Sequence, residues 1–265
     1  MWIDTHCHLD AQEFGAESEA VAARAAQGGV AMIVIPAVQR ANFDVVAALS
    51  ARVPNSSYAL GIHPIYVPQA TEDDLAALRT AVHGAMADPR FVAIGEIGLD
   101  FFIPMLCEPA MREKQVYFLR EQLRIARDAG LPVLTHVRRS QDQVLKHARQ
   151  IPPQGGIAHA FNGSAQQAQA FIDIGFKLGF GGAMTFTRAL QIRRLAATLP
   201  LESIVLETDA PDISPAWLHP GRNGPEQLPA IGAVLAELRG MAPAAVAAQT
   251  ALNAAAVMPR LQSLM

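Results

Sequence analysis

Short apolar runs alternate with amphipathic or alanine-rich runs along the whole chain. Most of the apolar runs are continuous, which is typical of parallel strands that are buried on both faces. They predict eight strands, at Trp2–His8, Val30–Val38, Tyr58–Ile62, Phe91–Leu99, Leu131–Val137, Gly156–Phe161, Phe176–Gly181 and Ser203–Thr208. The intervening runs predict helices, at Ala16–Gln27, Phe43–Ala51, Glu72–Ala87, Pro109–Ala129, Gln141–Gln150, Ala165–Ile174, Arg188–Leu199, Pro225–Arg239 and Pro243–Met258.

This regular alternation predicts an α/β fold of the TIM type, a (β/α)8 barrel. A chain of 265 residues matches the roughly 250 residues of a single barrel domain, so we expect one domain over residues 1–265. The alternative is an open doubly wound sheet, which usually has fewer strands. It is disfavoured because Thr5-His6-Cys7-His8 stands where a glycine-rich dinucleotide-binding turn would follow the first strand.

Composition excludes several classes of protein. Charged residues make up 17% of the chain and the net charge is −3, so neither a disordered polyelectrolyte nor a broad basic surface for duplex DNA is expected. The two cysteines provide neither a disulfide framework nor a thiolate zinc site. No signal peptide and no long uncharged apolar stretch is recognisable, so we expect a cytoplasmic protein with no membrane contact and no obligate protein partner.

Polar side chains gather where the predicted strands end. Enzymes built on this barrel carry their catalytic groups at the C-terminal ends of the strands. A single histidine in an apolar run is usually a core residue bonded to the backbone. Five of the eight histidines at such ends, together with a glutamate and an aspartate, indicate a shared metal centre instead. These residues are His6, His8, His63, Glu96, His136, His159 and Asp209.

The donor set combines imidazole and carboxylate without thiolate, which leaves Zn²⁺, Mn²⁺, Fe²⁺ and Mg²⁺ all possible. The six predicted ligands are His6, His8, Glu96, His136, His159 and Asp209. Six exceed the needs of one catalytic ion but suit two ions about 3.5–4 Å apart. Two catalytic roles follow: Glu96 would bridge the ions, and Asp209 would pair with the water that they activate.

Three more residues have predicted roles near this centre. Arg138 lies two residues after His136 and therefore shares its face, where a guanidinium suits a phosphate oxygen. His63 is expected to contact the substrate. Glu207 precedes Asp209 by two residues and is expected to orient a metal ligand.

Six segments together resemble the TatD family of metal-dependent deoxyribonucleases, within the amidohydrolase-like barrels. The pattern around Arg138-Arg139-Ser140 and Asp209-Ala210-Pro211-Asp212 is similar to that of a less characterised bacterial subgroup. The segments are Asp4-Thr5-His6-Cys7-His8-Leu9-Asp10, Gly61-Ile62-His63-Pro64, Gly95-Glu96-Ile97-Gly98-Leu99-Asp100, His136-Val137-Arg138, His159-Ala160-Phe161-Asn162-Gly163 and Glu207-Thr208-Asp209-Ala210-Pro211. The resemblance implies that His6, His8 and Asp209 hold one ion. It likewise implies that His136 and His159 hold the other and that Glu96 serves both. Phe101-Phe102 and Arg139 depart from the residues usual in the family, which bears on substrate preference; a base could stack on either phenylalanine.

The resulting hypothesis is a divalent-metal-dependent hydrolase of phosphodiester bonds. By resemblance it is a DNase with 3′–5′ exonuclease activity on single-stranded DNA ends, using two ions (Mg²⁺, Mn²⁺ or Zn²⁺) to activate water. A hydrolase of a small amide, lactone or phosphoester is the first alternative, although Glu96 occupies the place where many such barrels carry a carbamylated lysine. A non-catalytic binding protein is the second alternative, but none of the six predicted ligands is missing.

Overall fold

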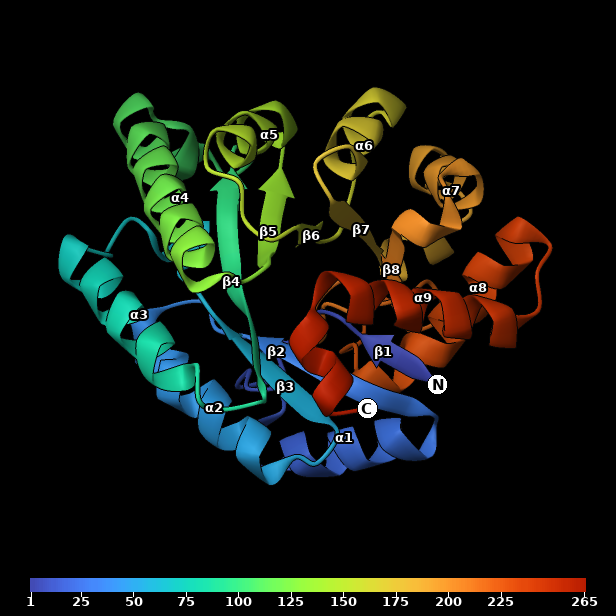
Figure 1. The fold of residues 1–265 in the computed structure, drawn as a ribbon. Coiled ribbons are helices and arrows are strands. Elements are labelled where there is room, and N and C mark those ends of the chain that lie inside the picture. The colour runs from blue at the N-terminus through green and yellow to red at the C-terminus, as the bar shows by residue number, and fades with distance from the viewer.

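The computed structural model describes residues 1–265 and confirms the predicted (β/α)8 barrel (Figure 1). Eight parallel strands form one sheet in chain order: β1 (Trp2–Asp4), β2 (Val30–Pro36), β3 (Ser56–Leu60), β4 (Phe91–Asp100), β5 (Val133–Arg138), β6 (Gly156–Ala158), β7 (Phe176–Phe180) and β8 (Ile204–Leu206). The helices are α1 (Ser18–Gln27), α2 (Phe43–Arg52), α3 (Glu72–Ala85), α4 (Pro109–Ala129), α5 (Gln141–Gln150), α6 (Ala165–Ile172), α7 (Leu190–Thr198), α8 (Leu228–Arg239) and α9 (Pro243–Val257).

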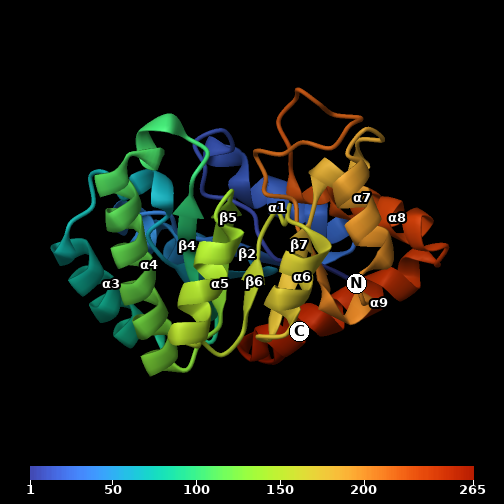
Figure 2. The same cartoon turned by 90° about the horizontal axis from the view of Figure 1, so that it is seen from above.

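Two layers of apolar side chains stabilise the barrel. Inside it, strand residues such as Ile3, Val34 and Leu134 form a cluster with Ala254 and Val257 of α9. Helix α9 therefore closes the N-terminal end of the barrel; in Figure 2 it lies below the strands, away from the loop that follows β8. A larger cluster fills the space between the strands and the surrounding helices. The C-terminal mouth is left open.

Helices α4 and α5 have the predicted bounds, whereas most of the other helices begin or end one to three residues away from them. Helix α4 has Pro109 at its first position, where a missing N–H costs no hydrogen bond, and it stops at Gly130, whose φ of 63° is left-handed.

No single helix is both long and apolar enough to cross a membrane. The segments Pro225–Arg239 and Pro243–Val257 together have the length and composition of a membrane-spanning helix, but they meet at an angle of 107°.

The barrel is nearly closed at the seam between β1 and β8. Beyond the strand ends, the backbone N–H of Thr5 donates to the Leu206 carbonyl at 3.1 Å, and the N–H of Asp209 donates to the His6 carbonyl at 2.8 Å. The seam is therefore held by the same segments that carry the predicted metal ligands.

Six strands are shorter than predicted, β2, β5 and β7 by only one or two residues. The larger differences are in β1, β6 and β8, which end before the histidines or aspartate that were expected at their ends. Strands β1, β6 and β8 end at Asp4, Ala158 and Leu206, so His6, His8, His159 and Asp209 all follow the regular strands. Left-handed backbone follows two of these strand ends, with φ of 44° at Ala160 after β6 and 56° at Asp209 after β8. Such conformations are costly for residues other than glycine and are concentrated at functional sites.

The Asp4 carboxylate ties β1 to the segment after β8. It is fully buried, and its Oδ1 accepts hydrogen bonds from the backbone N–H of Thr208 at 2.9 Å and of His6 at 3.3 Å. The Thr208 hydroxyl donates to Oδ2 at 2.6 Å. Burial raises the pKa of Asp4 to about 8, so an uncharged side chain of the same shape is a close substitute.

We expect Asp4→Ala to destabilise the fold by about 3 kcal/mol, because three buried donors lose their acceptor. Asp4→Asn keeps the Oδ1 acceptor and should cost less than half as much. Urea denaturation of both variants, with metal chelated, measures the difference. Equal stability of Asp4→Ala and the wild type would show that the seam does not depend on this carboxyl group.

Candidate active site

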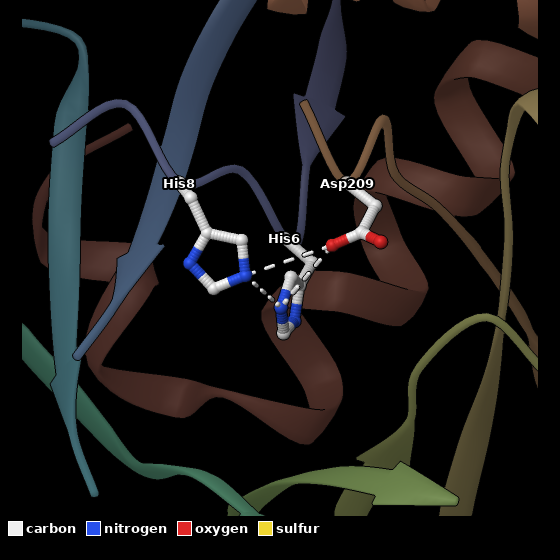
Figure 3. Close-up of side chains that lie close together, drawn as sticks. All are labelled: His6, His8 and Asp209. Atoms are coloured by element: carbon white, nitrogen blue, oxygen red, sulfur yellow. Dashed lines mark hydrogen bonds and ion pairs between the residues drawn. The ribbon is translucent and has the colours of Figure 1, made fainter. Parts of the chain in front are cut away.

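Glu96 lies at the centre of a buried group of polar side chains at the barrel mouth. Its Oε2 is 3.1 Å from His6 Nε2 and 3.5 Å from His8 Nε2. These two imidazole nitrogens are 3.3 Å apart, and each is 3.7 Å from Asp209 Oδ1. Figure 3 shows His8 and Asp209 directed toward one another with His6 between them. The donor atoms of His6, His8 and Asp209 are close enough to share one metal ion.

The other oxygen of Glu96 faces a second group of imidazoles. Its Oε1 lies 3.2 Å from His136 Nδ1, 3.4 Å from His63 Nε2 and 3.7 Å from His159 Nε2. One carboxylate thus contacts two sets of donors through different oxygens. The structure brings the six predicted ligands together, and Glu96 has the position that a bridging carboxylate requires.

Hydrogen bonding distinguishes His63 from the other histidines. The backbone N–H of Ile65 donates to His63 Nδ1 at 3.1 Å, so the neutral ring carries its proton on Nε2. That nitrogen faces Glu96, and a protonated nitrogen donates a hydrogen bond instead of binding a cation. Its position beside Glu96 would also allow a metal contact, but this tautomer favours the substrate contact predicted from the sequence.

The sequence interpretation missed Asp100, which orients His136. Its Oδ2 is 3.0 Å from His136 Nε2, while Oδ1 accepts the backbone N–H groups of Phe102 at 2.8 Å and Ile103 at 3.1 Å. Burial opposes ionisation, but the His136 hydrogen bond and these two N–H groups outweigh it and lower the pKa of Asp100 to about 2. With Nε2–H directed at Asp100, His136 presents the lone pair of Nδ1 to Glu96 and the metal centre. The even spacing of Asp100 from Glu96 in β4 was the available signal.

Glu207 has the corresponding position beside His159. Its Oε1 lies 3.3 Å from His159 Nδ1, without full hydrogen-bond geometry, and accepts the Ala160 N–H at 2.5 Å. Gly179 leaves room for this carboxylate, because a Cβ at position 179 would overlap it and displace it from His159. With Nδ1 turned toward Glu207, His159 presents Nε2 to Glu96.

Two of the imidazoles are held neutral. Burial lowers the pKa of His6 to about 3, assisted by the neighbouring His159. Burial also lowers the pKa of His63 to about 4. The Nδ1 of His6 is buried without a hydrogen-bond partner. A neutral imidazole is the form that binds metal, so the state of His6 fits a ligand.

Two other imidazoles, those of His8 and His159, are positively charged and pair with neighbouring carboxylates. Burial opposes protonation of His8, but Glu96 and Asp209 outweigh it and raise its pKa to about 9. Asp209 and Glu207 likewise outweigh burial and raise the pKa of His159 to about 10. The surrounding histidines hold the pKa of Glu96 well below its usual range despite its burial. In the metal-free protein, protons on His8 and His159 thus compensate carboxylates that divalent cations would otherwise neutralise.

The polar cluster forms the floor of a cleft of about 1240 Å³. Arg138 lies at its rim, about half exposed, with Nη1 3.8 Å from Asp100 Oδ2 and no contact with the predicted ligands. Phe102 lines the same cleft. Phe101 does not, since it packs against the apolar core with the Arg112 guanidinium over its ring. Only Phe102 of the two is therefore available to a substrate in this cleft.

Comparison with known proteins agrees with this arrangement. The family model described as TatD related DNase matches residues 3–259. This chain belongs to the TatD family. The metal-dependent hydrolase YjjV of Escherichia coli K12 is 41% identical over 253 residues, which cover 95% of each chain. The crystal structure of E. coli YjjV has a TM-score of 0.91 at 38% identity and covers 97% of this chain and 98% of its own.

A second relative carries a more specific name. The 3′-5′ ssDNA/RNA exonuclease TatD of Erwinia billingiae is 30% identical to this TatD family protein over 260 residues, covering 95% of this chain and 97% of its own. Together, the family match, these relatives and the clusters of potential ligands identify a metal-dependent hydrolase.

Proposed function

We propose that this TatD family protein is a phosphodiesterase that removes nucleotides from the 3′ end of single-stranded DNA. The observation that carries the proposal is the pair of donor groups on the two oxygens of Glu96, at the floor of an open cleft. The 30% identity to a relative named as a 3′-5′ ssDNA/RNA exonuclease supports this class of substrate. The net charge of −3 favours a strand end held by a few local contacts over a duplex held along its length.

The proposed ligand assignment for the first ion agrees with the close approach of the His6, His8 and Asp209 donor atoms, whereas the pairing of His136 with His159 rests on the family resemblance. His6, His8 and Asp209 would hold one divalent cation, His136 and His159 the other, and Glu96 both; these assignments are those implied by the family resemblance. Bound there, such ions supply Lewis acidity, lowering the pKa of water and neutralising charge on the phosphoryl oxygens.

The chain itself provides the proton acceptor and the phosphate contacts. Burial raises the pKa of Asp209 to about 6, which leaves it ionised at neutral pH and basic enough to accept a proton from the attacking water. His63 carries its Nε2–H toward the same centre and would donate it to a phosphate oxygen. The Arg138 guanidinium would hold a second phosphate oxygen from the rim.

We expect Arg138→Ala to lower kcat/KM on DNA by roughly tenfold to a hundredfold, because one charge-assisted hydrogen bond to phosphate is lost. Metal content should not change, since Arg138 contacts none of the proposed ligands. Arg149→Ala, which removes an exposed arginine from α5, is the matched control. Wild-type kinetics in Arg138→Ala would show that this side chain does not bind the substrate.

Metal affinity should rise with pH. His8 and His159 hold protons in the metal-free protein below about pH 9 and 10, and both must lose them to bind a cation. The logarithm of the association constant should therefore increase by up to about 2 per pH unit between about pH 7 and 9. Calorimetric titration with Zn²⁺ or Mn²⁺ in several buffers measures both the affinity and the number of protons released. A pH-independent affinity would exclude His8 and His159 as ligands.

The nuclease assignment is tested with a single-stranded oligonucleotide labelled at its 5′ end, incubated with Mg²⁺ or Mn²⁺. Products that shorten progressively from the 3′ end support it. An intact oligonucleotide with every divalent ion, together with turnover of a small amide or lactone, would contradict it.

A further inference from the structure

Two adjacent arginines at the end of β5 share one aromatic ring. The Cζ atom of Arg138 lies 3.9 Å from the centroid of the Phe102 ring, and that of Arg139 lies 4.6 Å from it. Consecutive residues of an extended strand point to opposite sides. Arg139 departs from this rule because its backbone is left-handed, with a φ of 55°, and both guanidinium groups therefore reach the same ring.

Stacking on an aromatic ring holds a guanidinium without using its hydrogen-bond donors. The N–H groups lie in the guanidinium plane and remain free for a planar or tetrahedral anion. Arg139 forms no ion pair and no side-chain hydrogen bond, and it is exposed. Arg138 has only Asp100 at 3.8 Å, and that carboxylate already accepts from His136. The positive charge on this side of the cleft is therefore largely uncompensated.

Charge is distributed unevenly around the cleft. Arg138 and Arg139 are the only lysines or arginines that line it. Across the barrel mouth, the loops after β1 and β8 contribute the acidic Asp10, Glu13 and Asp212 to the lining. A strand with several phosphates is therefore favoured on the β5 side and repelled on the β1–β8 side.

We propose that Arg139, held beside Arg138 by Phe102, binds the phosphate on the 5′ side of the scissile phosphodiester. This inference rests on the proposed 3′-end nuclease function. Hydrolysis of the bond between phosphorus and the upstream O3′ leaves the scissile phosphate on the released nucleotide, whose other end is an uncharged 3′ hydroxyl. All remaining phosphates lie upstream. With Arg138 on the scissile phosphate, Arg139 is the one remaining lysine or arginine in the lining of the cleft that can receive the next phosphate. The site thus sets the direction in which the strand enters.

Three dinucleotide substrates distinguish a phosphate contact at this site from a contact with the scissile phosphate. dTpdT has only the scissile phosphate, pdTpdT adds one upstream, and dTpdTp adds one downstream. We expect the wild-type protein to cleave pdTpdT with a kcat/KM roughly tenfold above that of dTpdT, because a tenfold gain corresponds to the free energy of one hydrogen bond between charged groups. No such gain is expected with dTpdTp. Arg139→Gln should abolish the gain and leave dTpdT cleavage unchanged. Arg139→Lys should restore part of the gain, and Arg149→Gln should behave as the wild type.

A binding measurement provides a readout that does not depend on turnover. The probe is an oligothymidylate with phosphorothioate linkages, which resist hydrolysis, and a 5′-fluorescein label. Fluorescence anisotropy with this probe measures how the affinity of the metal-loaded protein depends on salt concentration. For Arg139→Gln, the slope of log K against log salt concentration should shrink by about 0.7, corresponding to one phosphate contact on a single strand.

The outcomes are distinguishable. An equal loss on dTpdT and pdTpdT, or a salt slope and substrate preference unchanged by Arg139→Gln, overturns the upstream site while the nuclease function stands. A salt slope that depends on Arg139, without cleavage of any DNA substrate, supports the phosphate site and contradicts the nuclease function. A wild-type protein that neither binds nor cleaves the oligonucleotides contradicts both.

Discussion

Glu96→Gln is expected to lose bound metal and to reduce kcat/KM on DNA by at least about a thousandfold, while keeping the barrel fold. The amide has the shape of the carboxylate but supplies no negative charge between two cations, and several kcal/mol of transition-state stabilisation depend on those cations. Because the side chain is buried and contacts five imidazoles through its two oxygens, no neighbouring carboxylate can replace it.

Metal analysis by mass spectrometry, circular dichroism and steady-state kinetics on the same preparation measure this effect. Glu113→Gln removes the same charge from the exposed surface of α4 and should match the wild type. Full metal occupancy with unchanged turnover in Glu96→Gln would show that Glu96 has a structural role only.

Asp209→Asn should affect chemistry more than metal content. Loss of a general base lowers kcat by about a hundredfold to ten thousandfold, whereas five of the six proposed ligands remain. Since Asp209 must be ionised to accept a proton, wild-type kcat should rise with pH and level off above the pKa of this group. Burial places that pKa at about 6 in the metal-free protein, and a neighbouring cation would lower it further, so the acidic limb should lie at or below about pH 6.

The variant should lack this acidic limb over the range in which the metal centre remains intact. Asp44→Asn, at an exposed position of α2, controls for the loss of one carboxylate. If Asp209→Asn retains the wild-type pH profile and rate, another group accepts the proton.

Much of the fold could be predicted from the sequence, because the apolar runs, their alternation with helical segments and the polar residues at strand ends all indicate the same barrel. Continuous apolar runs such as Val30–Val38 have no polar face to expose, which requires cover on both sides and favours a parallel barrel. The positions of His136 and Glu96 at strand ends then placed them at one mouth. The ends of β1, β6 and β8 were less predictable. Left-handed residues follow two of them, Ala160 after β6 and Asp209 after β8, and no residue type in the sequence indicates this conformation.

The missing parts of the site depend on contacts and backbone conformations that residue types alone do not indicate. Asp100 was visible as a strand-end carboxylate, but its function appears only when His136 from β5 lies beside it. The proton position on His63 is set by the Ile65 N–H, and the direction of Arg139 is set by its own φ and by the Phe102 ring. Residue type alone identified the donors, whereas tautomer and orientation required the structure.

Anomalous diffraction from crystals loaded with Mn²⁺ or Zn²⁺ tests directly whether Glu96 is shared by two metal ions. We expect two peaks. One should lie among His6, His8 and Asp209, and the other should face His136 Nδ1 and His159 Nε2, each with a Glu96 oxygen about 2.0–2.2 Å away in the Zn²⁺ form. A single peak that excludes Glu96, or no peak at the barrel mouth, would contradict a shared metal centre.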